Sequence, residues 1–267
     1  MIFSMGVDIG SLSSKCVILK DGHEVRAAEV YNTGTGSDGP QRVVRSALHQ
    51  AGLQADEIHY IVATGYGRVI YEEADQEISE IACHAKGALF QEPQTRTVID
   101  IGGQDAKAIS MGEAGKVLHF EMNEKCAAGT GRFLDVMAQA LGYPVTKLAL
   151  LGQDASEKVE ISSTCTVFAE SEVISHLTAK KRVEDVVAGI HDSIARRITG
   201  LVRRVGLKQK VTMTGGVALN AGVVQALENR LSCRLTIPSY AQLNGALGAS
   251  IYAYEKFQNR LKEERHV

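Results

Sequence analysis

The chain has 267 residues, of which 45% are hydrophobic and 22% are charged, with 26 glycines and 4 prolines. This length suits two compact lobes or one large one, and the composition excludes disordered and collagen-like proteins. The formal net charge of −2 provides no field for binding nucleic acid or an anionic membrane. No apolar run reaches the roughly 20 residues of a membrane helix, and residues 1–10 lack a signal-peptide pattern. We therefore expect a cytoplasmic α/β protein.

The first expected element is a β-hairpin that begins with Val7-Asp8-Ile9-Gly10, passes through Lys15 and ends at the turn Asp21-Gly22. The same pattern returns with Ile99-Asp100-Ile101-Gly102 and Lys107, 92 residues later at both the aspartate and the lysine. A strand, a tight turn containing glycine and a second strand are typical of a hairpin. The repeat predicts two related β-rich lobes that face one another.

Between the hairpins, apolar residues at helical spacing predict a helix over 40–51. Residues 58–63 are predicted to form a strand, and 72–90 a mostly helical segment. The polar link 93–96 predicts a lobe boundary. Residues 1–95 would then form the first lobe, joined by a C-terminal helix within about 240–267, and residues 96–239 the second.

In the second lobe an amphipathic helix is expected over 133–141, where Gly142 ends it. A long helix is predicted over 183–205, followed by a buried strand over 211–214. The last predicted helix covers 245–262 and returns the chain to the first lobe.

Two short segments, Asp8–Ser11 and Asp100–Gln104, each place a carboxylate at the end of an apolar strand with a small flexible turn after it. Such a turn lets backbone N–H groups approach phosphate, while the carboxylate holds Mg²⁺ directly or through water. A third turn, 214–217, follows a strand and precedes a helical pattern, where α/β sheets commonly bind nucleotides. P-loop and Rossmann glycine motifs are both absent.

With these turns in this order, the sequence resembles the actin, hexokinase and Hsp70 superfamily of two-lobed nucleotide phosphotransferases. The resemblance implies a duplicated ribonuclease-H-like α/β fold that binds ATP or ADP with Mg²⁺. Asp8, Asp100 and Gln104 become catalytic candidates, the two aspartates acting through Mg²⁺ and the attacking water. The expected nucleotide contacts are Gly10, Ser11, Leu12, Ser13, Lys15, Gly102, Gly103, Gln104, Gly129, Thr130, Gly215, Gly216, Val217 and Asn220. Lys15 and Lys107 either approach phosphate or cap their hairpins.

The five cysteines are Cys16, Cys83, Cys126, Cys165 and Cys233. They are widely spaced and odd in number, so a disulfide framework and a local zinc or ferredoxin-type motif are not expected. Cys126 and Cys165 stand ahead of helical patterns, and a thiolate is favoured at a helix N-terminus. Thiolates are what an iron–sulfur cluster requires. Two cysteines cannot complete a four-thiolate cluster, but two copies related by a twofold axis can.

Three segments, 99–107 (IDIGGQDAK), 123–133 (NEKCAAGTGRF) and 164–173 (TCTVFAESEV), closely resemble the 2-hydroxyacyl-CoA dehydratase activator family. That family includes the ATPase subunits of benzoyl-CoA reductase and the reductases of double-cubane cluster proteins. The match runs from Met5 to about Tyr252. It implies a homodimer with one [4Fe-4S] cluster, held by Cys126 and Cys165 of each subunit.

The resemblance also implies that ATP hydrolysis drives one low-potential electron from a ferredoxin or flavodoxin to a larger iron–sulfur partner enzyme. Closure around the γ-phosphate would rotate the helices that begin near Cys126 and Cys165. Arg196, Arg197, Arg203 and Arg204 are interpreted either as a docking patch for an acidic donor or as a solvated helix face.

Two other functions stay open at this point. One is a small-molecule kinase of the same superfamily, such as an N-acetylhexosamine kinase, and the other is a nucleotide-gated binding module without turnover. Cys16, Cys83, Cys233 and His84 are interpreted as core residues.

Overall fold

The computed structural model describes residues 1–123, 125–162 and 165–264, so Glu124, Ser163 and Thr164 of the cysteine motifs lie outside the described residues. The chain divides into two compact units. The first comprises Met1–Gln94, Ala114–Val117 and Gln242–Val267, and the second Thr95–Glu113 and Leu118–Ala241. Among the described residues, none of the helices has the length and apolar character to cross a membrane.

A five-stranded sheet in the order β3-β2-β1-β4-β5 forms the centre of the first unit. The strands are β1 (Phe3–Ile9), β2 (Ser14–Lys20), β3 (Glu24–Tyr31), β4 (Tyr60–Thr64) and β5 (Gln76–Glu77). β1 and β2 are antiparallel with Asp8 opposite Lys15, and β1 and β4 are parallel with Asp8 opposite Thr64. The first predicted hairpin is therefore confirmed.

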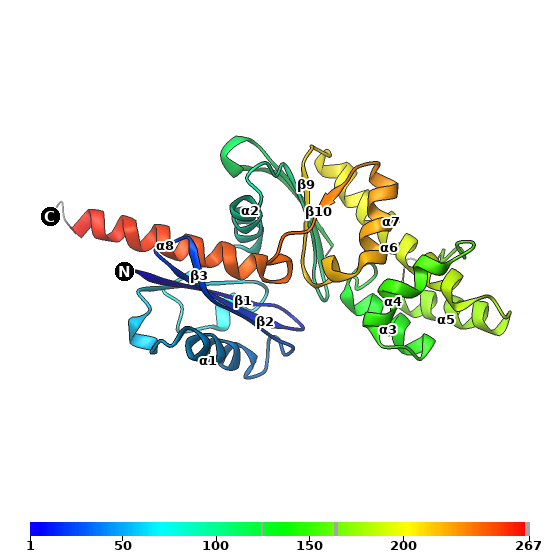
Figure 1. Ribbon diagram of the computed structural model, residues 1–267, viewed down its shortest axis with the longest axis horizontal. Coiled ribbons are helices and arrows are strands. Elements are labelled where there is room, and N and C mark those ends of the chain that lie inside the picture. The colour runs from blue at the N-terminus through cyan, green and yellow to red at the C-terminus, as the bar shows by residue number, and fades with distance from the viewer. Residues whose placement is uncertain (124, 163–164, 265–267) are drawn as a thin grey trace. The chain divides into compact units, whose positions relative to one another are not determined.

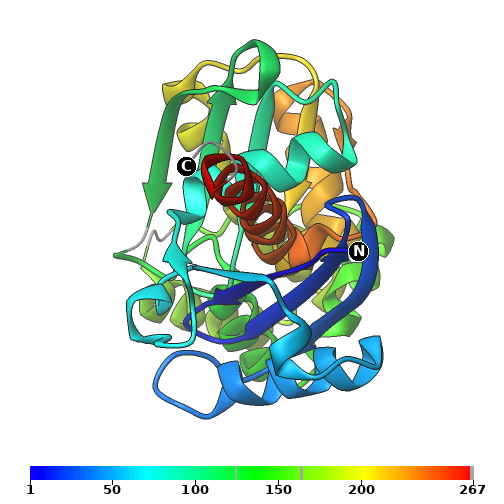
Figure 2. The same cartoon turned by 90° about the vertical axis from the view of Figure 1, so that its left-hand side faces the viewer.

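Helices α1 (Gly39–Ala51) and α8 (Asn244–Glu264) cover opposite faces of this sheet (Figure 1, Figure 2). The buried side chains of Val43 and Ala47 pack α1 into the core that β1 and β2 share. On the other face α8 also contacts α2 (Glu80–Gln91). The two helices approach through Gly248, where a β-carbon would overlap the carbonyl oxygen of Cys83, so only glycine fits at this crossing.

The helix predicted over 72–90 begins later than expected. Ser79 caps α2 by accepting a hydrogen bond of 3.4 Å from the Ala82 amide, and the chain before it follows the edge of the sheet. Asp75 accepts a 2.7 Å hydrogen bond from the Ile61 amide of β4, and Gln76–Glu77 form β5 beside β4. The helical prediction for 72–79 is wrong because these backbone groups pair with a neighbouring strand.

The second unit repeats the same sheet topology, with the order β10-β9-β6-β7-β8. Its strands are β6 (Thr97–Ile101), β7 (Ala106–Met111), β8 (Val117–Asn123), β9 (Val211–Thr214) and β10 (Leu235–Thr236). Asp100 is opposite Lys107 in the antiparallel pair β6–β7 and opposite Thr214 in the parallel pair β6–β9. The 92-residue repeat of the sequence is thus a duplicated strand arrangement.

The helices of the second unit are α3 (Gly131–Leu141), α4 (Val145–Leu151), α5 (Thr166–Thr178), α6 (Val183–Val205) and α7 (Ala221–Leu231). The predicted helix over 183–205 and strand over 211–214 are both confirmed, and α4 is an additional element. Acidic residues in the first turn of α6 and arginines in its last turn suit the helix dipole. The α6 residues Val187, Ile190 and Ile194 form part of the buried core beside this sheet.

Candidate functional site

In the first unit, the carboxylate of Asp8 lies at the end of β1, directly before the turn to β2. The amide of Gly10 donates a 3.0 Å hydrogen bond to the carbonyl of Ser13, which closes a tight turn around the half-buried Ser11 and Leu12. Lys15 Nζ lies 3.4 Å from Asp8 Oδ2. Asp8 is only 7% exposed. Because β1 pairs with β2 and β4 on either side of Asp8, its backbone is held at the start of the turn.

The second unit contains the same turn. Gly102 N donates to Asp105 O at 3.0 Å, and Gly103 and the exposed Gln104 lie within the turn. Lys107 Nζ lies 3.4 Å from Asp100 Oδ2 and 2.7 Å from Asp105 Oδ2. Both lysines therefore neutralise the aspartate of their own hairpin.

The third turn follows β9 and is joined to the second turn by a side chain. Thr214 Oγ1 donates a 2.7 Å hydrogen bond to Asp100 Oδ1. Gly215 has a φ of +87°, and a β-carbon there would overlap the carbonyl of Ile101. Gly216 and Val217 form a short 3₁₀ turn, and Asn220 caps α7 through a 3.1 Å bond from the Val223 amide.

The loop that carries Cys126 is held by side-chain hydrogen bonds. Asn123 Nδ2 donates to the carbonyls of Cys126 and Ala128 at 2.8 and 3.3 Å. The fully buried Thr130 donates from its hydroxyl to the carbonyl of Ala127 at 2.5 Å. Gly129 turns the chain with a φ of +87°. The loop thus has a conformation fixed by its own polar residues.

This cysteine loop also contacts the second turn. Gly131 N donates to Gly102 O at 2.9 Å, and Arg132 N donates to Gly103 O at 2.8 Å. Two backbone hydrogen bonds therefore connect the expected phosphate-binding residues to the segment that positions Cys126.

The two candidate cluster cysteines have different local settings. Cys165 is exposed and is the N-cap residue of α5, as the sequence pattern predicts. Cys126 is half-buried and lies five residues before α3, whose N-cap is Thr130. The expectation that Cys126 sits at a helix N-terminus is wrong, because the Asn123 and Thr130 hydrogen bonds form a separate loop there. Among the described residues, no group of three or more histidines, cysteines or carboxylates forms a metal-binding set.

The other thiols are less accessible. Burial raises the pKa of the Cys83 thiol to about 12, and burial together with Glu29 raises the pKa of Cys16. Burial also raises the pKa of the half-buried Cys233. A buried protonated thiol is a poor metal ligand, so the core interpretation suits Cys16 and Cys83.

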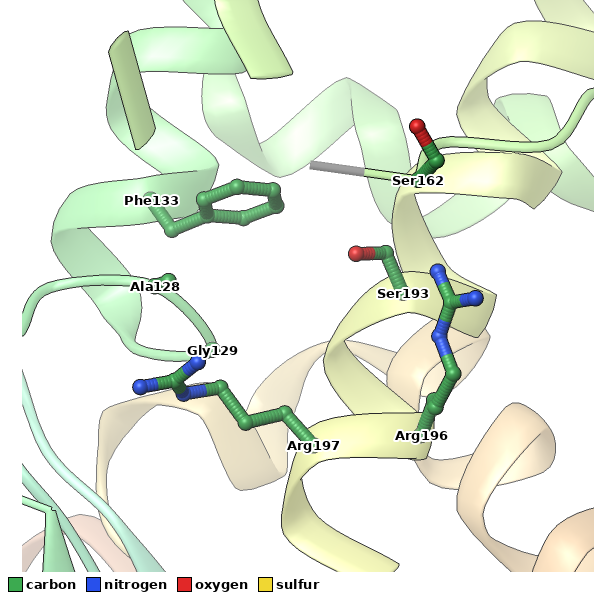
Figure 3. Close-up of a pocket in the computed structure, with 7 residues that line it drawn as sticks. All are labelled: Ala128, Gly129, Phe133, Ser162, Ser193, Arg196 and Arg197. Carbon is green, nitrogen blue, oxygen red and sulfur yellow. The ribbon is translucent and has the colours of Figure 1, made fainter. Parts of the chain in front are cut away.

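A cavity of about 150 Å³ adjoins the cysteine loop (Figure 3). Its lining consists of small, aromatic and basic side chains, namely Ala128, Gly129, Phe133, Ser162, Ser193, Arg196 and Arg197. Arg196 donates to the carbonyl of Ile161, and the Arg197 side chain runs alongside Gly129. Arg204 pairs with Glu121 at 2.8 Å. Each of these three α6 arginines thus contacts residues of the second unit.

Over residues 5–253 the chain matches the BadF/BadG/BcrA/BcrD ATPase family. It belongs to this ATPase family. A 2-hydroxyisocaproyl-CoA dehydratase activator from Clostridioides difficile is 49% identical over 266 residues, covering 100% of both chains. The (R)-2-hydroxyglutaryl-CoA dehydratase activating ATPase of Acidaminococcus fermentans is 52% identical, over 96% of this chain and 98% of its own.

Solved structures confirm the expected fold class of this ATPase-family member. The 2-hydroxyisocaproyl-CoA dehydratase activator from Clostridium difficile with bound ADPNP superimposes with a TM-score of 0.95 at 50% identity, covering 98% of each chain. A ROK family glucokinase from Streptomyces griseus gives a TM-score of 0.59 at 13% identity, covering 95% of this chain and 99% of its own. The second likeness shows the fold alone.

Three residues lie in segments that the sequence motifs include, but the motifs predict no role for them. Thr214 donates a hydrogen bond to Asp100, and Asp105 accepts one from Lys107. Asn123 donates to the backbone carbonyl of Cys126. The sequence does contain a signal for Thr214: the pair Thr214-Gly215 repeats the pair Thr64-Gly65, and each pair stands at the end of a strand. Nothing in the sequence pattern indicates the partners of Asp105 or Asn123.

Proposed function

We propose that this ATPase is a reductive activator that uses ATP hydrolysis to deliver one low-potential electron to an iron–sulfur enzyme of the 2-hydroxyacyl-CoA dehydratase or benzoyl-CoA reductase type. The observation that carries the proposal is the backbone connection between Gly102–Gly103 and the Cys126 loop. Relatives named as activators match the whole chain at about half identity, which supports the same role here.

The nucleotide site would use the three turns already described. The first two turns would present backbone N–H groups and the carboxylates of Asp8 and Asp100 to MgATP, with Gln104 beside the attacking water. The third turn, at Gly215–Val217, would receive the adenosine. The ADPNP-bound activator of similar fold supports nucleotide binding by this chain.

The thiols of Cys126 and Cys165 fit an iron–sulfur cluster in chemistry and exposure. Both reach solvent at least in part, in contrast to the buried Cys16 and Cys83. The two thiols of one chain are half of a four-thiolate set, so a homodimer would supply one [4Fe-4S] cluster with two cysteines from each subunit. When bound, the cluster would supply one-electron redox chemistry, with a ferredoxin or flavodoxin as donor.

Two backbone hydrogen bonds of the second unit support a coupling between the nucleotide and the cysteines. If ATP and ADP contact the Gly102–Gly103 turn differently, they bias the loop that this turn holds through Gly131 and Arg132. The chain's own residues would thus bind phosphate and fix the position of Cys126. They would also transmit a conformational change from the phosphate-binding turn to the Cys126 loop.

Anaerobic purification of Cys126→Ser and Cys165→Ser variants tests the proposal. We expect each to lose bound iron while retaining ADP binding, whereas the matched Cys233→Ser control keeps the wild-type iron of about four per dimer. Wild-type iron in either of the first two variants overturns the cluster assignment. A colourless wild-type protein that phosphorylates a sugar would support a kinase instead, and tight ATP binding without phosphate release would support a binding module.

A further inference from the structure

The imidazole of His84 takes part in a buried polar network between α2 and α8 of the first unit. Asn244 Nδ2 lies 3.3 Å from His84 Nδ1 and donates to the His84 carbonyl at 2.9 Å. The Asn244 amide oxygen accepts a 3.0 Å bond from Gln91 Nε2. His84 is 7% exposed and Asn244 is fully buried.

This network sets the tautomer of His84. A carbonyl oxygen only accepts hydrogen bonds, so the atom of Asn244 that faces the His84 carbonyl must be its NH₂ group. The same NH₂ group donates to Nδ1, and the neutral imidazole therefore carries its proton on Nε2. The buried amide thereby presents His84 as a hydrogen-bond donor through Nε2–H.

Gly245 lies against both the imidazole of His84 and the carboxylate of Asp8. A β-carbon on Gly245 would lie 3.2 Å from His84 Nε2 and 3.0 Å from Asp8 Oδ2. His84 Nε2 and Asp8 Oδ2 thus lie close to the same point beside Gly245, and a larger residue there would press on both groups. Lys15 Nζ is 3.4 Å from the same carboxylate oxygen.

The duplicated aspartate of the second unit has a different support. There Thr214 donates directly to Asp100, whereas the corresponding hydroxyl of Thr64 makes no hydrogen bond to Asp8. The parallel pairs β1–β4 and β6–β9 have the same register, because each places its aspartate opposite its threonine. Asp8 thus lacks the threonine donor of its counterpart, and the imidazole of His84 lies near it instead.

We propose that His84 is a positioning residue for ATP hydrolysis. Its Nε2–H would donate a hydrogen bond to the water or phosphate oxygen that lies beside Asp8 when nucleotide is bound. The assignment rests on the proposed function, because it takes Asp8 as part of the nucleotide site. It adds a role to the packing role that the sequence pattern predicts for His84.

Steady-state phosphate release with MgATP tests this role in three variants of the full-length protein. His84→Leu removes the donor, and His84→Gln retains an N–H group near the position of Nε2. Asn244→Asp keeps His84 but replaces the donor to Nδ1 with an acceptor, which favours the opposite tautomer. His49→Leu, an exposed histidine on α1, is the matched control.

We expect His84→Leu and Asn244→Asp to lower kcat by about tenfold to a hundredfold while KM for MgATP changes less than about threefold. His84→Gln should recover most of kcat, and His49→Leu should behave as wild type. A kcat for folded His84→Leu equal to wild type, or a His84→Gln variant as impaired as His84→Leu, overturns the role of His84 alone. A wild-type protein that releases no phosphate from ATP overturns the proposed function as well.

Discussion

The side-chain amide of Asn123 donates a 2.8 Å hydrogen bond to the backbone carbonyl of Cys126. With the Ala128 carbonyl bonded to the same amide and the Ala127 carbonyl bonded to Thr130, three consecutive carbonyls are satisfied by side chains. The cysteine is therefore presented by a self-contained loop, and Asn123 decides how firmly the loop is held.

Asn123→Ala should loosen this loop and leave two carbonyls without their donor, at a cost of about 1–2 kcal/mol in stability. We expect the variant to lose iron to an added chelator several times faster than wild type, as followed by the decay of visible absorbance. Asn229→Ala, at an exposed position of α7, is the control. Equal decay rates in all three proteins would contradict the role given to Asn123.

Thiol reactivity should follow burial. In metal-free protein at about pH 8, Cys126 and Cys165 should react with iodoacetamide, while Cys16 and Cys83 stay protonated and protected because burial raises their pKa. Peptide mass spectrometry after a timed reaction measures each site, and a urea-unfolded sample should show all sites modified. Rapid native modification of Cys83 would mean that the α2–α8 crossing opens readily.

His191 should make the protein less stable in acid. Burial lowers the pKa of this α6 histidine from 6.5 to about 4, and its Nε2 has no hydrogen-bond partner in the described part of the chain. Below about pH 6.5 the unfolded chain binds a proton that the folded chain does not. The free energy of unfolding should therefore fall between about pH 6.5 and 4, by up to about 3 kcal/mol.

Urea unfolding at about pH 7 and pH 5 checks this expectation, because most carboxylates titrate at lower pH. His191→Leu should show a smaller fall over this interval than wild type. An unchanged pH dependence in the variant would assign the acid sensitivity to other groups.

Asp100→Asn should reduce ATP hydrolysis by about a hundredfold and leave the bound iron unchanged. The asparagine still accepts from Thr214, and Asp105 still neutralises Lys107 at 2.7 Å, so the second unit should fold. Phosphate release and iron content are measured on the same sample. Loss of iron together with normal hydrolysis would refute the assignment of Asp100.

Two glycines in helix interiors should respond to alanine in opposite ways. Gly248→Ala places a methyl group onto the Cys83 carbonyl, which should cost about 1–3 kcal/mol or more. Gly200→Ala in α6 meets only the tip of the Arg204 side chain at 3.9 Å, so it should gain up to about 1 kcal/mol from helix propensity. Thermal unfolding of the two variants beside wild type gives the comparison.

The sequence pattern predicts the parts of this fold that depend on local periodicity. The duplicated hairpins, the helix over 183–205 and the strand over 211–214 all follow from apolar spacing and the 92-residue repeat, and the structure confirms them. The segment 72–79 fails because its backbone pairs with β4, a tertiary choice that propensity does not encode.

The candidate site divides in the same way. The aspartates and glycines of the turns are visible in the sequence because they repeat, and Cys165 is visible because it starts a helix. The loop of Cys126, the bond from Thr214 to Asp100 and the network of His84 with Asn244 depend on residues distant in the chain or on exact side-chain geometry. Those contacts appear only once the strands and helices are placed.

The crossing of α2 and α8 has a consequence for biosynthesis. Residues 3–94 emerge from the ribosome first, yet the sheet face that α8 covers stays bare until residues 244–264 have been made. The second unit, whose strands and helices all precede Gln242, can finish folding earlier. The first unit therefore receives its last structural element after the second unit is complete, and during translation its uncovered sheet face is the surface that a chaperone would shield.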